Sequence, residues 1–160
     1  MTKLKTKAVR RQAVKTTTIK IKALDPRMTV PTYGTACSAG ADLYAVLDEP
    51  ITLAPHETKF IPTGLAFEIP DGLVGLVFAR SGLSSKQDLA PATKVSVIDS
   101  DYRGELMISL HNHGTQTRTV NNGDRIAQFM FTPYVKAQFE LVDELSDTAR
   151  GGGGFGHTGK

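Results

Sequence analysis

Tryptophan is absent from this sequence, cysteine occurs once, and no apolar run is long. An internal disulfide or a cysteine-based zinc cluster needs several cysteines, so the single Cys37 excludes both. No neighbouring base marks Cys37 as a nucleophile, and we expect a small, partly buried side chain there. A membrane-spanning helix needs ~18 consecutive apolar residues, which no stretch approaches. The sequence thus predicts no membrane partner and a reducing, cytoplasmic setting.

Acidic side chains are missing from the first 24 positions, which distorts the net charge of +3. Eight of the 19 basic residues precede Asp25, and the rest of the chain holds 11 basic against 16 acidic groups, a net charge of −5. We interpret residues 1–17 as a basic, disordered extension. Weak contact with polyanions or a targeting role are the alternatives, and no specific nucleic-acid partner is expected. A secretory signal is disfavoured because no continuous apolar segment is present.

Helical periodicity is also scarce, and the 160 residues fit one domain. Short alternating or apolar runs bounded by proline and glycine are typical of an all-β protein. We expect strands at residues 18–24, 65–69, 73–78, 95–98, 106–110, 126–131 and 137–142. A short helix is predicted over residues 83–88. These signals favour a jelly-roll-like β-sandwich over residues 18–145.

The last eleven residues are mostly glycine and carry one guanidinium, Arg150, and one aromatic ring, Phe155. A segment without an apolar face and with a large ordering entropy should be mobile. We interpret residues 146–160 as an arm that closes over a ligand that is anionic at one end and flat at the other. A nucleotide fits that description, and the alternative is a glycine-rich tail without a function.

A concentrated group of polar residues follows the predicted strand at 95–98. Asp99 and Asp101 should point to one side with the period of a strand, where paired acids bind a divalent ion or activate a water. The alternative is an acidic turn in which Arg103 pairs with Glu105.

A cation, a hydroxyl and a small residue stand together in Arg80-Ser81-Gly82, between a predicted strand and the predicted helix. Backbone N–H groups at a helix start make this a natural anion cradle. The alternative is a serine N-cap beside a surface arginine.

Three further positions are each more often structural than functional when taken alone. Asp42 lies between small residues that allow close approach, and Gln128 offers an amide donor on a predicted strand. His111 and His113 alternate along a strand, but a metal site needs a third ligand near them.

These segments, in this order, resemble the five motifs of the homotrimeric dUTP pyrophosphatases (dUTPases), bacterial type, from residue 19 to the C-terminus. The resemblance implies a jelly-roll homotrimer whose active sites are each shared by three subunits, with the C-terminal arm exchanged between them. It further implies hydrolysis of dUTP to dUMP and pyrophosphate by water attack on the α-phosphate, with Mg²⁺ on the triphosphate. Such an enzyme supplies dUMP for thymidylate synthesis and keeps uracil out of DNA.

The resemblance also implies a role for each residue that matches a motif. Asp99 would hold and deprotonate the attacking water, and Tyr102 would pack beneath the deoxyribose and exclude a 2′-hydroxyl. Asp42 would reach Mg²⁺ through water. The remaining implied contacts with substrate are Thr93, Val97, Ile98 and Met107 near the uracil, Arg80, Ser81, Gly82 and Gln128 on the phosphates, and Arg150, Phe155 and Gly156 on the arm.

Three positions depart from the family pattern: Ala79, Thr93 and Ser96 replace the commoner Pro, Asn and Gly. If uracil is recognised through the backbone, the last two change little. If the Asn amide takes part in recognition, discrimination of uracil from cytosine would be weaker here. A dCTP deaminase, or a bifunctional deaminase–dUTPase, shares the fold and is the nearest alternative. Such enzymes have their catalytic glutamate on the strand that matches residues 106–110, and this sequence has no carboxylate there. A non-catalytic binding protein is the second alternative, although Asp99 and the arm are both present.

Overall fold

The computed structural model describes residues 15–154; the first fourteen and the last six residues lie outside the described part. Within it the chain forms eleven strands and one short helix. In chain order the elements are β1 (Lys20–Ala23), β2 (Thr32–Tyr33), β3 (Ala41–Tyr44), β4 (Ile51–Leu53), β5 (Thr58–Glu68), β6 (Leu73–Phe78), α1 (Ser81–Gln87), β7 (Leu89–Pro91), β8 (Val95–Ile98), β9 (Glu105–Asn112), β10 (Arg118–Val120) and β11 (Arg125–Pro133). The all-β prediction is confirmed.

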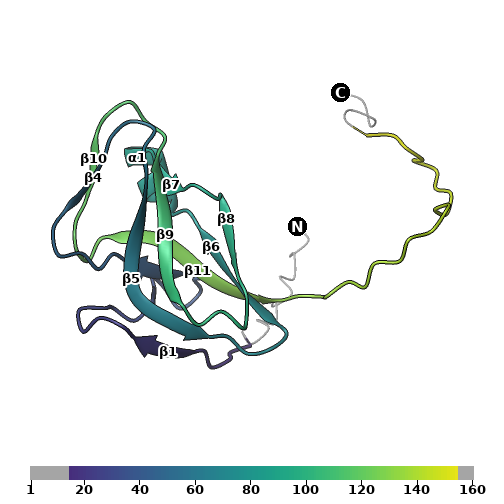
Figure 1. Cartoon of the computed structure of the whole chain (residues 1–160), viewed down its shortest axis with the longest axis horizontal. Coiled ribbons are helices and arrows are strands. Elements are labelled where there is room, and N and C mark those ends of the chain that lie inside the picture. Colours follow the sequence, from purple (N-terminus) through teal and green to yellow (C-terminus); the bar gives the residue numbers. More distant parts are fainter. Residues whose placement is uncertain (1–14, 155–160) are drawn as a thin grey trace, which may run out of the picture.

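The strands build two main sheets and one small ribbon, and every pairing is antiparallel. One sheet has the order β1-β5-β9-β7, the other β2-β3-β11-β6-β8, and β10 pairs with β4 alone. Figure 1 shows β5 and β9 running side by side through the body, with β6 and β8 to the right of them. The arrangement is a β-sandwich, as predicted.

The core lies between the two sheets because each strand buries alternate side chains. Along β9, Leu106, Ile108 and Leu110 are buried while Met107 between them is exposed. The rings of Phe67 on β5 and Phe129 on β11 meet edge to face, with centroids 5.1 Å apart, and so join the sheets.

Strand predictions were most accurate where alternation or an apolar run was long. Residues 73–78 and 95–98 form β6 and β8 with the predicted bounds, and β5, β9 and β11 are longer than predicted. The strand at 18–24 shortens to β1, an edge strand whose residues are all exposed rather than half-buried. Strands β2, β3, β4, β7 and β10 were not predicted. Four of them have only two or three residues, too few to show a period, and the four residues of β3 include the charged Asp42 and so form no apolar run.

The strand predicted at residues 137–142 is wrong for the single chain. This segment has the right composition but forms no strand, and none of the strands in residues 15–154 pairs with it. Phe139 is 94% exposed and Leu141 is 100% exposed. Figure 1 shows the chain leaving β11 and running away from the body through this segment. The apolar side chains that favour a strand therefore find no partner within one copy.

Three smaller expectations differ or lie outside the described part. The helix begins two residues before the predicted start and ends at Gln87, where Asp88 turns the chain with a φ of 56°. Cys37 is exposed, not partly buried. The predicted disorder of residues 1–17 falls almost wholly outside the described residues. In the described part no helix has the length and hydropathy needed to cross a membrane.

Candidate active site

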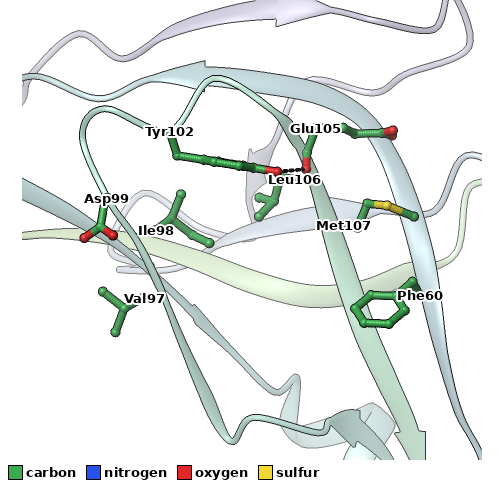
Figure 2. A pocket seen from close by; sticks show the side chains of 8 residues that line it. All are labelled: Phe60, Val97, Ile98, Asp99, Tyr102, Glu105, Leu106 and Met107. Carbon is green, nitrogen blue, oxygen red and sulfur yellow. Dashed lines mark hydrogen bonds between the residues drawn. The ribbon is translucent and has the colours of Figure 1, made fainter.

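A pocket of about 390 Å³ opens between the end of β8 and the strands β5 and β9. Figure 2 shows Asp99 and Val97 on one side, Tyr102 above, and Met107 with Phe60 on the other side. We call it the Tyr102 pocket; its lining residues are Phe60, Val97, Ile98, Asp99, Tyr102, Glu105, Leu106 and Met107. Five of the predicted site residues, Val97, Ile98, Asp99, Tyr102 and Met107, therefore lie together.

The turn between β8 and β9 builds this pocket. β8 lies at the edge of its sheet and pairs only with β6 in the described part, so its other edge of backbone groups faces outward. The N–H of Tyr102 donates to the Asp99 carbonyl at 3.3 Å, which bends the chain back. The Tyr102 hydroxyl donates to the Glu105 carbonyl at 2.9 Å. A carboxylate, a flat ring and a free strand edge thus border one cavity.

The predicted pairing of the two acids is only partly right. Asp99 also borders a second groove of about 710 Å³, which contains Asp101 and the side chains of Tyr134 and Lys136. Asp101 does not border the Tyr102 pocket, because the chain turns after Ile98 and strand alternation ends there.

The alternative in which Arg103 pairs with Glu105 is wrong. Arg103 Nη1 donates to the carbonyls of Ser100 and Tyr102, at 2.6 and 3.0 Å. The Glu105 carboxylate instead accepts the Gly64 N–H at 2.8 Å. Arg103 therefore stabilises the turn itself, and Glu105 ties the end of the turn to β5.

A second group of site residues surrounds Asp42, which is only 4% exposed. Arg80 Nε donates to Asp42 Oδ1 at 2.8 Å, and Gln128 Nε2 reaches the same oxygen at 3.3 Å. Arg125 Nη1 donates to Oδ2 at 3.1 Å. We call these four residues the Asp42 cluster. Because two guanidinium groups surround one carboxylate, the Asp42 cluster as a whole has a net positive charge, which suits an anionic ligand.

The strand register brings the Asp42 cluster together. Asp42 on β3 lies directly opposite Gln128 on β11. Gly40 makes room, because a Cβ there would lie 3.2 Å from the Gln128 Cβ. Arg80 follows β6, the other neighbour of β11. Asp42 thus has the close approach that its small neighbours predicted.

Arg80 occupies the N-cap position of α1, and no side chain caps the helix. Ser81 and Gly82 are its first two residues. The alternative of a serine N-cap with a surface arginine is therefore wrong, since the Arg80 side chain is 21% exposed and ion-paired with Asp42.

Two predicted contacts lie apart from both groups. Thr93 precedes β8, and its hydroxyl is bonded to that of Ser96 at 2.5 Å, outside the lining of the Tyr102 pocket. Arg150 donates through Nε to the Gly153 carbonyl at 2.8 Å within the exposed C-terminal segment. Phe155 and Gly156 lie outside the described residues. The Tyr102 pocket and the Asp42 cluster themselves share no residue.

Comparison with known proteins decides what this geometry belongs to. The family model described as dUTPase matches residues 26–159. The chain belongs to the dUTPase family. It is 48% identical over 147 residues to the deoxyuridine 5′-triphosphate nucleotidohydrolases of Enterobacter sp. and Escherichia coli, covering 89% of this chain and 97% of each relative. The predicted activity, dUTP hydrolysis, is confirmed at this level.

Solved structures of dUTPases have the same fold. A glycine-to-serine mutant of the Staphylococcus bacteriophage 80alpha dUTPase with dUpNHpp has a TM-score of 0.81 and 28% identity, covering 91% of this chain and all of that one. A variant of the phage phi11 dUTPase of S. aureus has a TM-score of 0.73 and 27% identity, covering 82% of this chain and all of that one. That structure is described as revealing the coordination of a structural Mg(II) ion.

The fit of this dUTPase to a magnesium ion can be tested from its donors. In the described part no three His, Cys, Asp or Glu side chains gather to hold a metal. His111 and His113 are in ring contact, at 4.4 Å between centroids, and Thr58 bonds His111 Nδ1 at 2.8 Å. Three donors occupy Asp42, and two carboxylate oxygens offer about four acceptor sites. One site remains for a water, which fits an ion held mainly by substrate phosphates.

Sequence reasoning missed four residues of these two groups: Phe60, Glu105, Leu106 and Arg125. Arg125 gave a usable signal, since it stands in the same dUTPase motif as Gln128. Phe60 gave a weaker signal: it is an aromatic residue on a strand, and in the structure it is 66% exposed. Only the β5–β9 pairing brings Phe60 to the pocket.

Proposed function

We propose that this chain is a Mg²⁺-dependent, homotrimeric dUTP diphosphatase that releases dUMP and pyrophosphate by water attack on the α-phosphate. It would thereby supply dUMP for thymidylate synthesis and keep uracil out of DNA, in the cytoplasm, where its single thiol stays reduced. The observation that carries the proposal is the Tyr102 pocket, with a carboxylate, a flat ring and a free strand edge around one cavity.

The uracil and the sugar occupy the Tyr102 pocket in this proposal. The free edge of β8, at Val97 and Ile98, offers backbone donors and acceptors to the polar edge of the base. Thr93 contributes through the turn that leads into β8, and Met107 supplies an apolar contact for the base. Tyr102 lies under the deoxyribose and leaves no space for a 2′-hydroxyl.

Asp99 is the catalytic base. It stands where β8 ends, at the rim of the Tyr102 pocket, so a bound sugar would present its α-phosphate nearby. The carboxylate accepts a proton from one water as that water attacks phosphorus and the bond to the pyrophosphate leaving group breaks. A positioned general base typically contributes ~10²–10⁴-fold to the rate.

The phosphate chain binds at the Asp42 cluster and the start of α1. Arg80 and Gln128 donate to phosphate oxygens, together with Ser81 and Gly82, and donors fixed around a reacting phosphate can each contribute roughly 3 kcal/mol. Mg²⁺ would supply charge neutralisation on the triphosphate. Asp42 would hold that ion through water with its remaining acceptor site.

Three copies assemble in this proposal, because one copy carries the two halves of the site as separate groups. Exposed apolar side chains support the assembly: Phe60 and Val97 are 66% and 62% exposed beside the pocket. The extended segment after β11 adds Val135, Phe139 and Leu141, each at least 94% exposed. A run of exposed apolar side chains along one segment marks a surface that another protein chain covers. This segment would lie against a neighbouring copy and carry the arm, residues 146–160, to that copy's site.

The arm completes the site in this proposal. Arg150 would clamp the terminal phosphate with its planar guanidinium, and Phe155 would stack on the uracil, with Gly156 beside it. Closure excludes water other than the nucleophile. Removal of residues 150–160 should leave the assembly intact and strongly reduce turnover.

Pyrophosphate release tests the reaction across dUTP, dCTP, dTTP and UTP, each with and without Mg²⁺. We expect release from dUTP with Mg²⁺ and little from the others. Ammonia release from dCTP would instead support the deaminase alternative, and tight dUTP binding without turnover the non-catalytic one. Light scattering after gel filtration tests the assembly, which should weigh about three times the 17.2 kDa chain.

Asp99→Asn tests the catalytic base, with Asp101→Asn as the matched control from the same turn. The amide keeps the shape but cannot take a proton, so turnover should fall by about 10²-fold or more while dUTP still binds. Asp101→Asn should retain most activity, since Asp101 lies outside the Tyr102 pocket. Equal activity in the two variants would remove Asp99 from the mechanism.

A further inference from the structure

The Tyr102 ring borders the pocket from an exposed turn, and its side chain is not held by burial. The residue is 47% exposed, and its hydroxyl donates to the Glu105 carbonyl at 2.9 Å. Figure 2 shows the ring edge-on above the pocket, with its hydroxyl end at the start of β9. Since an exposed side chain normally samples several rotamers, something else must fix the plane of this ring.

Gly104 fills that role by having no side chain. A Cβ at this position would lie 2.6 Å from the Tyr102 Cζ and 2.8 Å from Cε2, and closer still to the hydroxyl oxygen. Ordinary contacts of a Cβ are 3.4–4 Å, so any side chain at Gly104 would displace the ring by about 1 Å. The ring therefore lies directly against the backbone of residue 104.

Glu105 fixes the backbone against which the ring lies. Its carboxylate accepts the Gly64 N–H at 2.8 Å, at a point where the β5–β9 register shifts between Pro62 and Ala66. Gly64 has a φ of 67°, and a Cβ there would lie 3.0 Å from the Asp25 Cβ. The Gly64 carbonyl also accepts the Leu24 N–H at 2.8 Å, so this donor is itself firmly held.

We propose that Gly104 and Glu105 together fix the position of the Tyr102 ring plane relative to the bound sugar. We call these two residues the seat of the ring, and we propose that the seat determines the preference for deoxyribose over ribose. The inference rests on the proposed function and deepens it. Tyr102 can exclude one additional hydroxyl oxygen only if its plane is fixed to a fraction of an ångström. Gly104 supplies the space, and Glu105 links the hydroxyl's acceptor to the bulge of β5. Both are positioning residues, because they act through Tyr102.

The test is the ratio of kcat/KM for dUTP to that for UTP, measured for the full-length protein and its variants. Gly104→Ala should lower kcat/KM for dUTP by roughly 10²-fold, the scale of a ~1 Å misplacement. UTP should lose much less, since it never gains the close fit, and the ratio should fall at least about tenfold. Gly34→Ala is the matched control: its new Cβ meets only the Ser38 Oγ, at 3.7 Å, and the ratio should not change.

Variants of the two neighbouring residues separate positioning from folding, in case Gly104→Ala does not fold. Tyr102→Phe removes the hydrogen bond to Glu105 and should lower the ratio about fivefold. Glu105→Ala removes the acceptor for Gly64 and should also lower the ratio. Glu105→Gln retains an acceptor oxygen and should restore most of it. Thermal melting of each variant confirms that the comparison is between folded proteins.

The outcomes distinguish this inference from the proposed function. A wild-type protein that does not hydrolyse dUTP would refute the proposed function. A wild-type protein that prefers dUTP, with folded Gly104→Ala losing both substrates in equal proportion, would overturn the seat alone. If that variant is unfolded, an unchanged ratio in Glu105→Ala would overturn it equally.

Discussion

Removal of the charge of Asp42 should lower both the free energy of unfolding and the turnover of dUTP. It is 4% exposed and accepts from Arg80, Gln128 and Arg125. Asp42→Asn keeps the volume but removes the charge, and the new amide N–H groups then face the N–H donors of these three side chains. The Arg125 side chain is 52% exposed and can turn to water, so its loss is small. Arg80, at 21% exposure, loses a charge-assisted bond, and we expect a total cost of about 2–3 kcal/mol.

Urea unfolding at one protein concentration measures that cost, because the stability of an oligomer depends on concentration. Asp48→Asn is the control: its carboxylate makes a shorter ion pair, 2.7 Å to Arg27, but is 89% exposed. The control should lose under ~1 kcal/mol. Turnover of dUTP should fall about 10²-fold in Asp42→Asn, since Arg80 is no longer held in place. An Asp42→Asn protein as stable and as active as the control would refute this reasoning.

Three further predictions follow from the fold. Gly75→Ala should cost about 1–3 kcal/mol in urea unfolding, because its Cβ would lie 2.6 Å from the Phe129 Cζ in the core; unchanged stability would contradict the packing. The Arg27 side chain hydrogen-bonds Asp25 and lowers the pKa of that carboxyl from 3.8 to about 2, so its stabilisation is complete above 3.8 and lost as pH falls through 2. Melting temperatures should therefore fall less steeply below about pH 4 in Asp25→Asn than in the wild type. Cys37 is exposed, and a thiol reagent should label it in the folded protein without loss of activity; labelling only after unfolding would contradict its placement.

The all-β class, strands β6 and β8 and most residues of the candidate site were readable from the sequence. Alternation and apolar runs are patterns of consecutive residues, so they indicate a strand wherever the pattern is long enough. The ordered motifs similarly name Asp99, Tyr102, Arg80 and Gln128. Such patterns do not show whether a strand has a partner to bond with. Residues 137–142 were therefore predicted as a strand from their composition, although they form none.

Pairing across the chain decided the rest. The register of β3 and β11 places Gln128 against Asp42, and Arg80 and Arg125 then share its buried carboxylate. The pairing of β5 with β9 brings Phe60 to the Tyr102 pocket and the Gly64 N–H to the Glu105 carboxylate. Such contacts join residues far apart in sequence, and their geometry depends on how the two sheets pack. The sequence determined which chemical groups this protein has, whereas the tertiary structure decided which of them meet.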